Sequence, residues 1–188
     1  AMKKGDGNDP DSNYEEVRYE GYGPEGIAII VEAMTNNKNR TAAEIRSIFS
    51  KSGGNLGENG SVSFGFKRLG SITLEKKIAS EEELFEFAIE HGSQDLESND
   101  EEHIIYCNQI DLQNLNQKII SKFGQTTSSK LVWKSDNTIE VGKETAEKLF
   151  QLLNSLEDNE DVQSVFSNFE VSEEVLTSLT WIERKLNA

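Results

Sequence analysis

The chain has 188 residues, a formal net charge of −15 and a hydrophobic content of 35%. Its longest apolar run, Ile27–Val31, is far too short to cross a bilayer. Cys107 is the only cysteine, which excludes an internal disulfide and fits a reducing compartment. We therefore expect a cytoplasmic protein with no membrane contact, built from two small domains or from one domain with a mobile part.

The charge is distributed unevenly along the chain. Residues 34–77 contain eight basic and three acidic residues, a net charge of +5, so the remainder carries −20. The overall acidity argues against tight binding to nucleic acid, whose phosphates would be repelled. The basic segment is either a binding face or a solvated surface of mixed charge.

The first third of the chain predicts an alternation of strands and helices. Residues 1–13 are polar and predict a linker. An alternating pattern predicts a half-buried strand at 14–20, and an apolar run predicts a central strand at 27–32. Thr41 forms a capping box with the glutamate three residues later and predicts a helix start. Alternating apolar residues predict another strand at 62–66.

A turn at Gly70 is predicted to precede a strand at 72–74, and Ser80 begins a second capping box and helix. The remaining expected elements are strands at 95–97, 104–107, 130–133, 138–141 and 162–169, helices beginning at Asp111 and near Ala146, and a loosely held helical tail from Val171.

The order of these elements predicts an α+β fold of two ferredoxin-like domains, with the second inserted into the first. From Gly70 to Trp133 the order is β-α-β-β-α-β, which is the split βαβ unit, and the flanking elements give the same order when joined. The strand at 14–20 would add an extra edge. The expected boundaries are 1–13 for the linker, 14–68 plus 137–172 for the first domain, 69–136 for the inserted domain and 173–188 for the tail.

Motifs for catalysis, cofactors and metals are weak. Gly21, Gly23 and Gly26 match the dinucleotide pattern G-x-G-x-x-G, but an apolar strand follows them where a phosphate-binding helix is required. We interpret them as a turn. His91 and His103 lack metal-ligand spacing and are expected in exposed loops. We expect no enzyme activity, no cofactor and no metal.

Polar amides and cations gather around the helix that begins near Thr41. Such residues at helix ends and glycine-rich loops suit contact with a phosphate backbone. The candidate nucleic-acid contacts are Lys38, Asn39, Arg40, Arg46, Lys51 and Asn55. From these loops alone, a nucleic acid and a protein partner remain alternatives.

Four ordered segments resemble the YebC family: YEGYGP at 19–24, NRTAAE at 39–44, FSKSGGNLGENGSV at 49–62 and DVQSVFSNF at 161–169. The resemblance implies a probable transcriptional regulator that binds DNA. The chain also resembles mitochondrial translational activators of this family, and bacterial members that are linked to the ribosome and to translation through proline runs. Family members carry a further basic helical domain at the N-terminus, and residues 1–5 resemble the end of its last helix. We therefore expect the chain to be a fragment.

The resemblance favours a non-enzymatic, nucleic-acid-associated regulator of gene expression, with DNA or ribosomal RNA as the target and a contact with the ribosome or polymerase. The alternative is an acidic protein-interaction module that recognises a basic partner.

Overall fold

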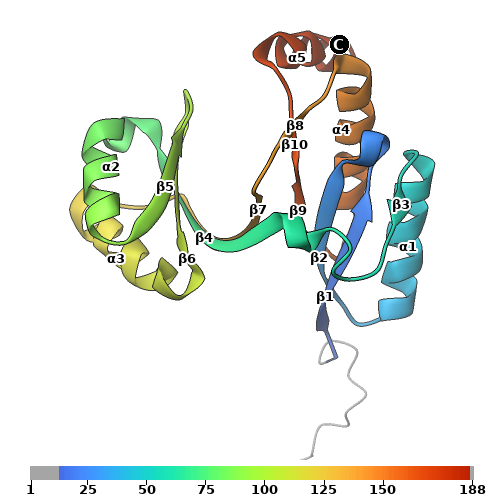
Figure 1. Cartoon of the computed structure of the whole chain (residues 1–188), viewed down its shortest axis with the longest axis horizontal. Coiled ribbons are helices and arrows are strands. Elements are labelled where there is room, and N and C mark those ends of the chain that lie inside the picture. The colour runs from blue at the N-terminus through green and yellow to red at the C-terminus, as the bar shows by residue number, and fades with distance from the viewer. Residues whose placement is uncertain (1–12, 187–188) are drawn as a thin grey trace, which may run out of the picture. The chain divides into compact units, whose positions relative to one another are not determined.

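A computed structural model describes residues 13–186, with side chains through Leu179; the linker expected at 1–13 lies outside the described residues except for Asn13. The chain forms two compact units (Figure 1). Unit 1 comprises the described residues up to Phe66 and from Ser135 onward, and unit 2 comprises Lys67–Lys134. Each unit contains one four-stranded sheet and its helices, which confirms the α+β class. No described helix is long and apolar enough to cross a membrane.

Unit 1 is built on a sheet with the strand order β3-β1-β2-β9. Its elements are β1 (Glu15–Tyr22), β2 (Ala28–Thr35), α1 (Lys38–Lys51), β3 (Asn55–Leu56), β8 (Ile139–Glu140), α4 (Lys143–Glu157), β9 (Val162–Ser167), β10 (Phe169–Glu170) and α5 (Glu173–Leu186). Apolar residues of α1 and α4 pack with the odd-numbered residues of β1 and β2 into one core. In α5, Val175 and Leu179 pack against the same core.

The strand expected at 14–20 forms as β1, and over that span it pairs with β2 alone, because the short β3 pairs only with Gly21 and Tyr22. Two expectations for unit 1 are wrong. The strand expected at 138–141 does not join the main sheet, since β8 pairs with β10 in a separate two-stranded ladder. Helix α1 begins at Lys38 rather than Thr41, because the Asn37 side chain accepts the Arg40 N–H and caps the helix.

Residues 62–66 also differ from the expected strand. Ser63–Gly65 form a 3-10 turn, and Phe66 begins a long strand of the other sheet. The alternation misleads because the backbone N–H groups here bind a buried carboxylate rather than a neighbouring strand. The alternation of buried and exposed residues at 62–66 therefore arises in a folded loop and not in a strand.

Unit 2 has the element order β4 (Phe66–Glu75), α2 (Glu81–Glu90), β5 (Ser93–Ser98), β6 (Glu102–Asn108), α3 (Leu112–Phe123) and β7 (Ser128–Ser135). Its sheet order is β5-β6-β4-β7. The core lies between the sheet and the two helices and contains Ile72, Ile105 and Leu115. Ser80 caps α2 as predicted, since its Oγ accepts the Glu83 N–H at 3.2 Å.

The turn expected at Gly70 is absent because Gly70 lies inside β4. A Cβ there would lie 2.9 Å from Cys107 Sγ and 2.9 Å from Leu112 Cβ, so glycine lets the start of α3 approach the sheet closely. Cys107 is fully buried in this core, and burial raises the pKa of its thiol. Asp111 makes no side-chain cap at the start of α3, which follows a short 3-10 turn instead.

His103 is not in an exposed loop, which corrects the expectation for this residue. It lies on β6 and is completely buried. Its Nε2 donates to the carbonyl of Ala79 at 2.8 Å, and its Nδ1 is hydrogen-bonded to the Ser98 hydroxyl at 2.7 Å. The ring thus ties the start of α2 to the β5–β6 hairpin.

Candidate nucleic-acid interface

The N-terminus of α1 is bound to the chain's own carboxylate, Asp161. Arg40 Nη2 lies 3.0 Å from Asp161 Oδ2, and Thr41 Oγ1 lies 2.7 Å from the same oxygen. Burial alone would raise the pKa of Asp161, but the hydrogen bonds from Thr41 and Arg40 outweigh it and hold the pKa below its ordinary value. The hydrogen bond between Arg40 and Asp161 also raises the pKa of Arg40.

Hydroxyl groups extend this network. Thr41 Oγ1 donates to Asp161 and lies 2.7 Å from Thr35 Oγ1 and 3.1 Å from the Asn37 carbonyl oxygen. Thr35 Oγ1 accepts the Asn37 N–H at 2.9 Å. These hydrogen bonds link β2, α1 and the residue before β9, so Asp161 has a structural role at the N-terminal end of α1.

Two of the six candidate contacts are therefore engaged within unit 1. Arg40 also lies 3.9 Å from Glu44, and Lys38 Nζ lies 2.7 Å from Glu15 Oε2. Both cations remain about half exposed, so each could contact a ligand while partly paired with an acid. Their net positive field is reduced by these carboxylates.

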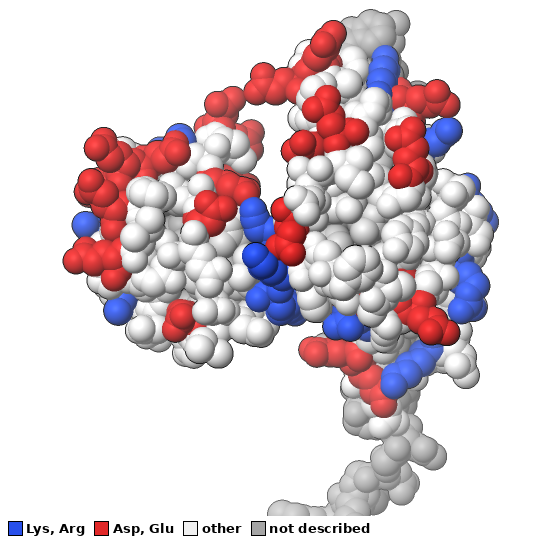
Figure 2. Space-filling model, in the orientation of Figure 1, with Lys and Arg blue, Asp and Glu red and all other residues white. Residues whose placement is uncertain are grey.

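The other four candidates are exposed, and they do not form one cluster. Arg46 and Lys51 form no ion pair with any residue in the described part of the chain. Asn39 and Arg46 share one face of α1 about 10 Å apart along the axis, whereas Lys51 projects from a different side of the helix. Asn55 lies on β3. On the face drawn in Figure 2, the basic side chains over α1 are scattered among neutral and acidic ones.

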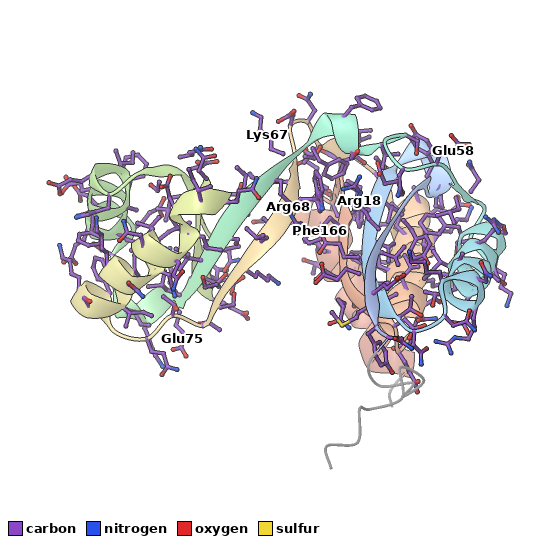
Figure 3. The ribbon with its side chains drawn as sticks, turned by 90° about the horizontal axis from the view of Figure 1, so that it is seen from below. Arg18, Glu58, Lys67, Arg68, Glu75 and Phe166 are labelled. Carbon is purple, nitrogen blue, oxygen red and sulfur yellow. The ribbon has the colours of Figure 1, made fainter. Side chains whose placement is uncertain are left out.

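The basic segment 34–77 is divided by the fold, since residues 34–66 belong to unit 1 and 67–77 to unit 2. Figure 3 labels Lys67 and Arg68 at one end of β4 and Glu75 at the other. Lys76 and Lys77 lie beside Glu81 and Glu75. A linear count of charge therefore overstates the basic surface of either unit.

Glu20 is the second buried carboxylate that the sequence did not reveal. It lies on β1 with no exposed surface, and its carboxylate accepts the N–H groups of Gly60, Val62 and Ser63 at 2.7, 3.2 and 2.7 Å. Arg18 Nε is 3.1 Å from it. Burial alone would raise the pKa of Glu20, but the hydrogen bonds from Gly60 and Ser63 hold it below the ordinary value. The carboxylate thus fixes the loop 57–65.

The glycine motifs at 21–26 and 53–57 pack against one another. A Cβ on Gly54 would lie 2.1 Å from the Tyr22 carbonyl oxygen, and one on Gly21 would lie 2.7 Å from the Asn55 oxygen. Glycine at these positions therefore allows two backbones to touch. The segment 24–26 is a short 3-10 turn into β2, as the interpretation of a turn required, and no helix follows it to bind a pyrophosphate.

One aromatic side chain on the loop 57–65 is almost fully exposed. Phe64 is 82% exposed, whereas Val62 and Phe66 on either side of it are 2% and 7% exposed. Figure 3 labels Glu58 on the same loop, and Arg18 and Phe166 on the face of the unit 1 sheet opposite α1. Among the described residues, no group of three or more His, Cys, Asp or Glu side chains is arranged to hold a metal ion.

Sequence reasoning missed Glu20, Asp161 and Phe64. The alternation in β1 placed Glu20 on the solvent side, and nothing local indicates that a loop 40 residues later covers it. Asp161 stood in an acidic run with no visible partner. Phe64 was assigned to a strand. Asp161 lies in the family motif at 161–169, and Glu20 lies in the one at 19–24. Membership of these motifs was the only sequence signal that pointed to either residue.

The described residues form an α+β protein of two sheet-bearing units, and the glycine motifs of unit 1 pack together. The comparisons give the family. Residues 14–169 match the model of the TACO1/YebC second and third domain, a family named for transcriptional regulation.

A solved structure supports the same assignment. It is the crystal structure of a conserved hypothetical protein, Aq1575, from Aquifex aeolicus, with 44% sequence identity and a TM-score of 0.82. The match covers 87% of this chain and 68% of that chain. The chain belongs to the TACO1/YebC family.

Proposed function

We propose that the chain is a non-enzymatic regulator of gene expression that associates with nucleic acid, either with DNA in transcription or with ribosomal RNA in translation. Its membership of a family named for transcriptional regulation carries the proposal. We favour the ribosome as the target, because the chain resembles mitochondrial translational activators. The protein would act in the cytoplasm without a cofactor.

The exposed cations of α1 support a phosphate contact. Arg46 and Lys51 are exposed and unpaired within the described chain, so neither must leave a carboxylate in order to bind a phosphate. Arg40 is a poorer test of binding, because its loss would also leave Asp161 without its cation. We assign Arg46 and Lys51 as the principal phosphate contacts, and Asn39 and Asn55 as polar contacts beside them.

The test is a double variant, Arg46→Ala with Lys51→Ala. Lys118→Ala with Lys143→Ala is its control, since it removes the same charge from exposed positions on α3 and α4. Binding to RNA and DNA oligonucleotides and to ribosomes is measured over a salt series. We expect only the α1 variant to bind more weakly, with a salt slope smaller by about 2. Equal affinities for the two double variants would overturn the assignment.

A second candidate is a protein-interaction module, which the surface of α2 favours. Acidic side chains gather over α2 in Figure 2. The exposed residues of this helix include Glu82 and Glu86, together with Phe85 and Ile89, which are 45% and 49% exposed. Acids around an apolar pair suit a basic, amphipathic partner segment such as one from a ribosomal protein or a polymerase. Capture of that partner after nuclease treatment, lost on Phe85→Ser with Ile89→Ser, would support this candidate.

We also infer that unit 2 is a ferredoxin-like domain inserted into unit 1. Its β-α-β-β-α-β order and its sheet order β5-β6-β4-β7 support this. The chain enters it after Phe66 and leaves it before Ser135. A deletion of residues 67–134 joined by a short glycine-serine linker is expected to leave unit 1 folded.

A further inference from the structure

Phe64 stands out in unit 1 because its ring is exposed while the backbone on both sides of it is held. On one side, the Val62 and Ser63 N–H groups donate to Glu20. On the other side, the Gly65 carbonyl accepts the Asp136 N–H at 3.0 Å. The Gly65 N–H donates to the Val62 carbonyl and closes the turn. The loop therefore holds the backbone of Phe64 in a fixed place. Because the ring stays exposed, folding gains no hydrophobic stabilisation from it.

The two neighbouring apolar side chains strengthen this fixation. Val62 and Phe66 point into the protein and are almost fully buried. Phe64 is the one large apolar residue of the loop 57–65 that points to solvent, and the others in this loop, apart from Val62, are glycine or polar. A ring held in this way loses little conformational freedom when it binds a partner.

We propose that Phe64 stacks on an unpaired base of a single-stranded nucleic acid. This inference rests on the proposed function and names the residue through which the protein would contact an unpaired strand. A base offers a flat π-face that needs only one aromatic ring, whereas a hot spot for a protein partner sits at the centre of a larger apolar patch. The small and polar neighbours of Phe64 match the first case.

One cation of unit 1 lies beside this loop, since Arg18 contacts the Glu20 carboxylate that holds the loop. Stacking is tolerant of sequence, so the site would favour unpaired over paired strands rather than one base over another.

The test compares Phe64→Ala and Phe64→Trp with the wild-type chain, and uses Ile110→Ala as a control. Ile110 is also a large apolar residue and is 84% exposed, but it lies in the 3-10 turn Gln109–Asp111 of unit 2. The probes are labelled single-stranded RNA and DNA 12-mers and a duplex of the same length, measured by fluorescence anisotropy over a salt series. Because Phe64 is exposed, the variants are expected to keep the wild-type melting temperature.

We expect Phe64→Ala to bind single strands about tenfold more weakly with an unchanged salt slope, since the cations remain. Phe64→Trp should bind like the wild type, with its new fluorescence quenched by the oligonucleotide. Ile110→Ala should have no effect, and duplex binding should not depend on Phe64.

Three results would overturn the proposal. Unchanged single-strand binding by Phe64→Ala would reject stacking and leave the proposed function standing, provided that the Arg46 and Lys51 variant still binds weakly. Equal weakening of single-strand and duplex binding by Phe64→Ala would show that the ring does not stack on an unpaired base. Absence of any RNA or DNA binding by the wild-type chain would reject the stacking contact and the nucleic-acid function together.

Discussion

Arg40 Nη2 and Asp161 Oδ2 lie 3.0 Å apart, although 121 positions separate the two residues in the chain. The pair joins the first turn of α1 to the residue before β9, and the residues of unit 2 lie between the two in the sequence. Unit 1 is therefore closed by a contact between its two separate chain segments. The contact also places a carboxylate beside the first turn of α1, where negative charge is favourable.

Asp161→Asn is expected to lower the free energy of unfolding by about 2 kcal/mol, because the Thr41 hydroxyl and the Arg40 guanidinium lose a charged acceptor. Urea unfolding measures the change. Asp158→Asn is the matched control, since Asp158 is exposed in the same loop at the C-terminal end of α4. If the two variants lost equal stability, the Asp161 network would have no special role.

The free energy of unfolding is expected to decrease as the pH is lowered below about 4.5. The pKa values of Glu20 and Asp161 are held below their ordinary values of 4.5 and 3.8. The unfolded chain therefore binds these protons first as the pH falls, and the stabilisation present at neutral pH is lost through that range. Urea midpoints between pH 7 and pH 2 measure the fall, which should be shallower in Glu20→Gln.

Glu20→Gln is expected to loosen the loop 57–65 and to cost about 2 kcal/mol, because three backbone N–H groups lose an ionised acceptor. Hydrogen exchange at Gly60, Val62 and Ser63 should become faster. Glu16→Gln on the same strand is the control, since Glu16 is exposed. Unchanged exchange at these three amides would show that the loop is held by its side chains instead.

Gly54→Ala is expected to destabilise the protein by about 3 kcal/mol or to prevent folding, because the new Cβ would lie 2.1 Å from the Tyr22 carbonyl oxygen. Gly65→Ala is the matched control, since no atom lies within 4 Å of its Cβ position. Thermal unfolding measures both. A mild effect of Gly54→Ala would mean that the two glycine motifs can separate without cost.

Most helices and strands followed from local patterns, and the failures share one cause. The apolar run at 27–32 and the capping box at Ser80 are local signals, and the expected elements form there. Residues 62–66 and Gly70 carry signals that only a distant partner explains, namely the Glu20 carboxylate and the approach of α3. The candidate site shows the same limit, because the partners of Arg40 and Lys38 are remote in sequence.

The central claim is that this chain associates with nucleic acid, and ribosome co-sedimentation over a salt series tests it most directly. We predict that the wild-type chain pellets with ribosomes at about 50 mM salt and is released as the salt concentration rises. The variant Arg46→Ala with Lys51→Ala should be released at lower salt, and Lys118→Ala with Lys143→Ala should behave like the wild type. A chain that pelleted with ribosomes at no salt concentration and bound neither RNA nor DNA oligonucleotides would contradict the claim.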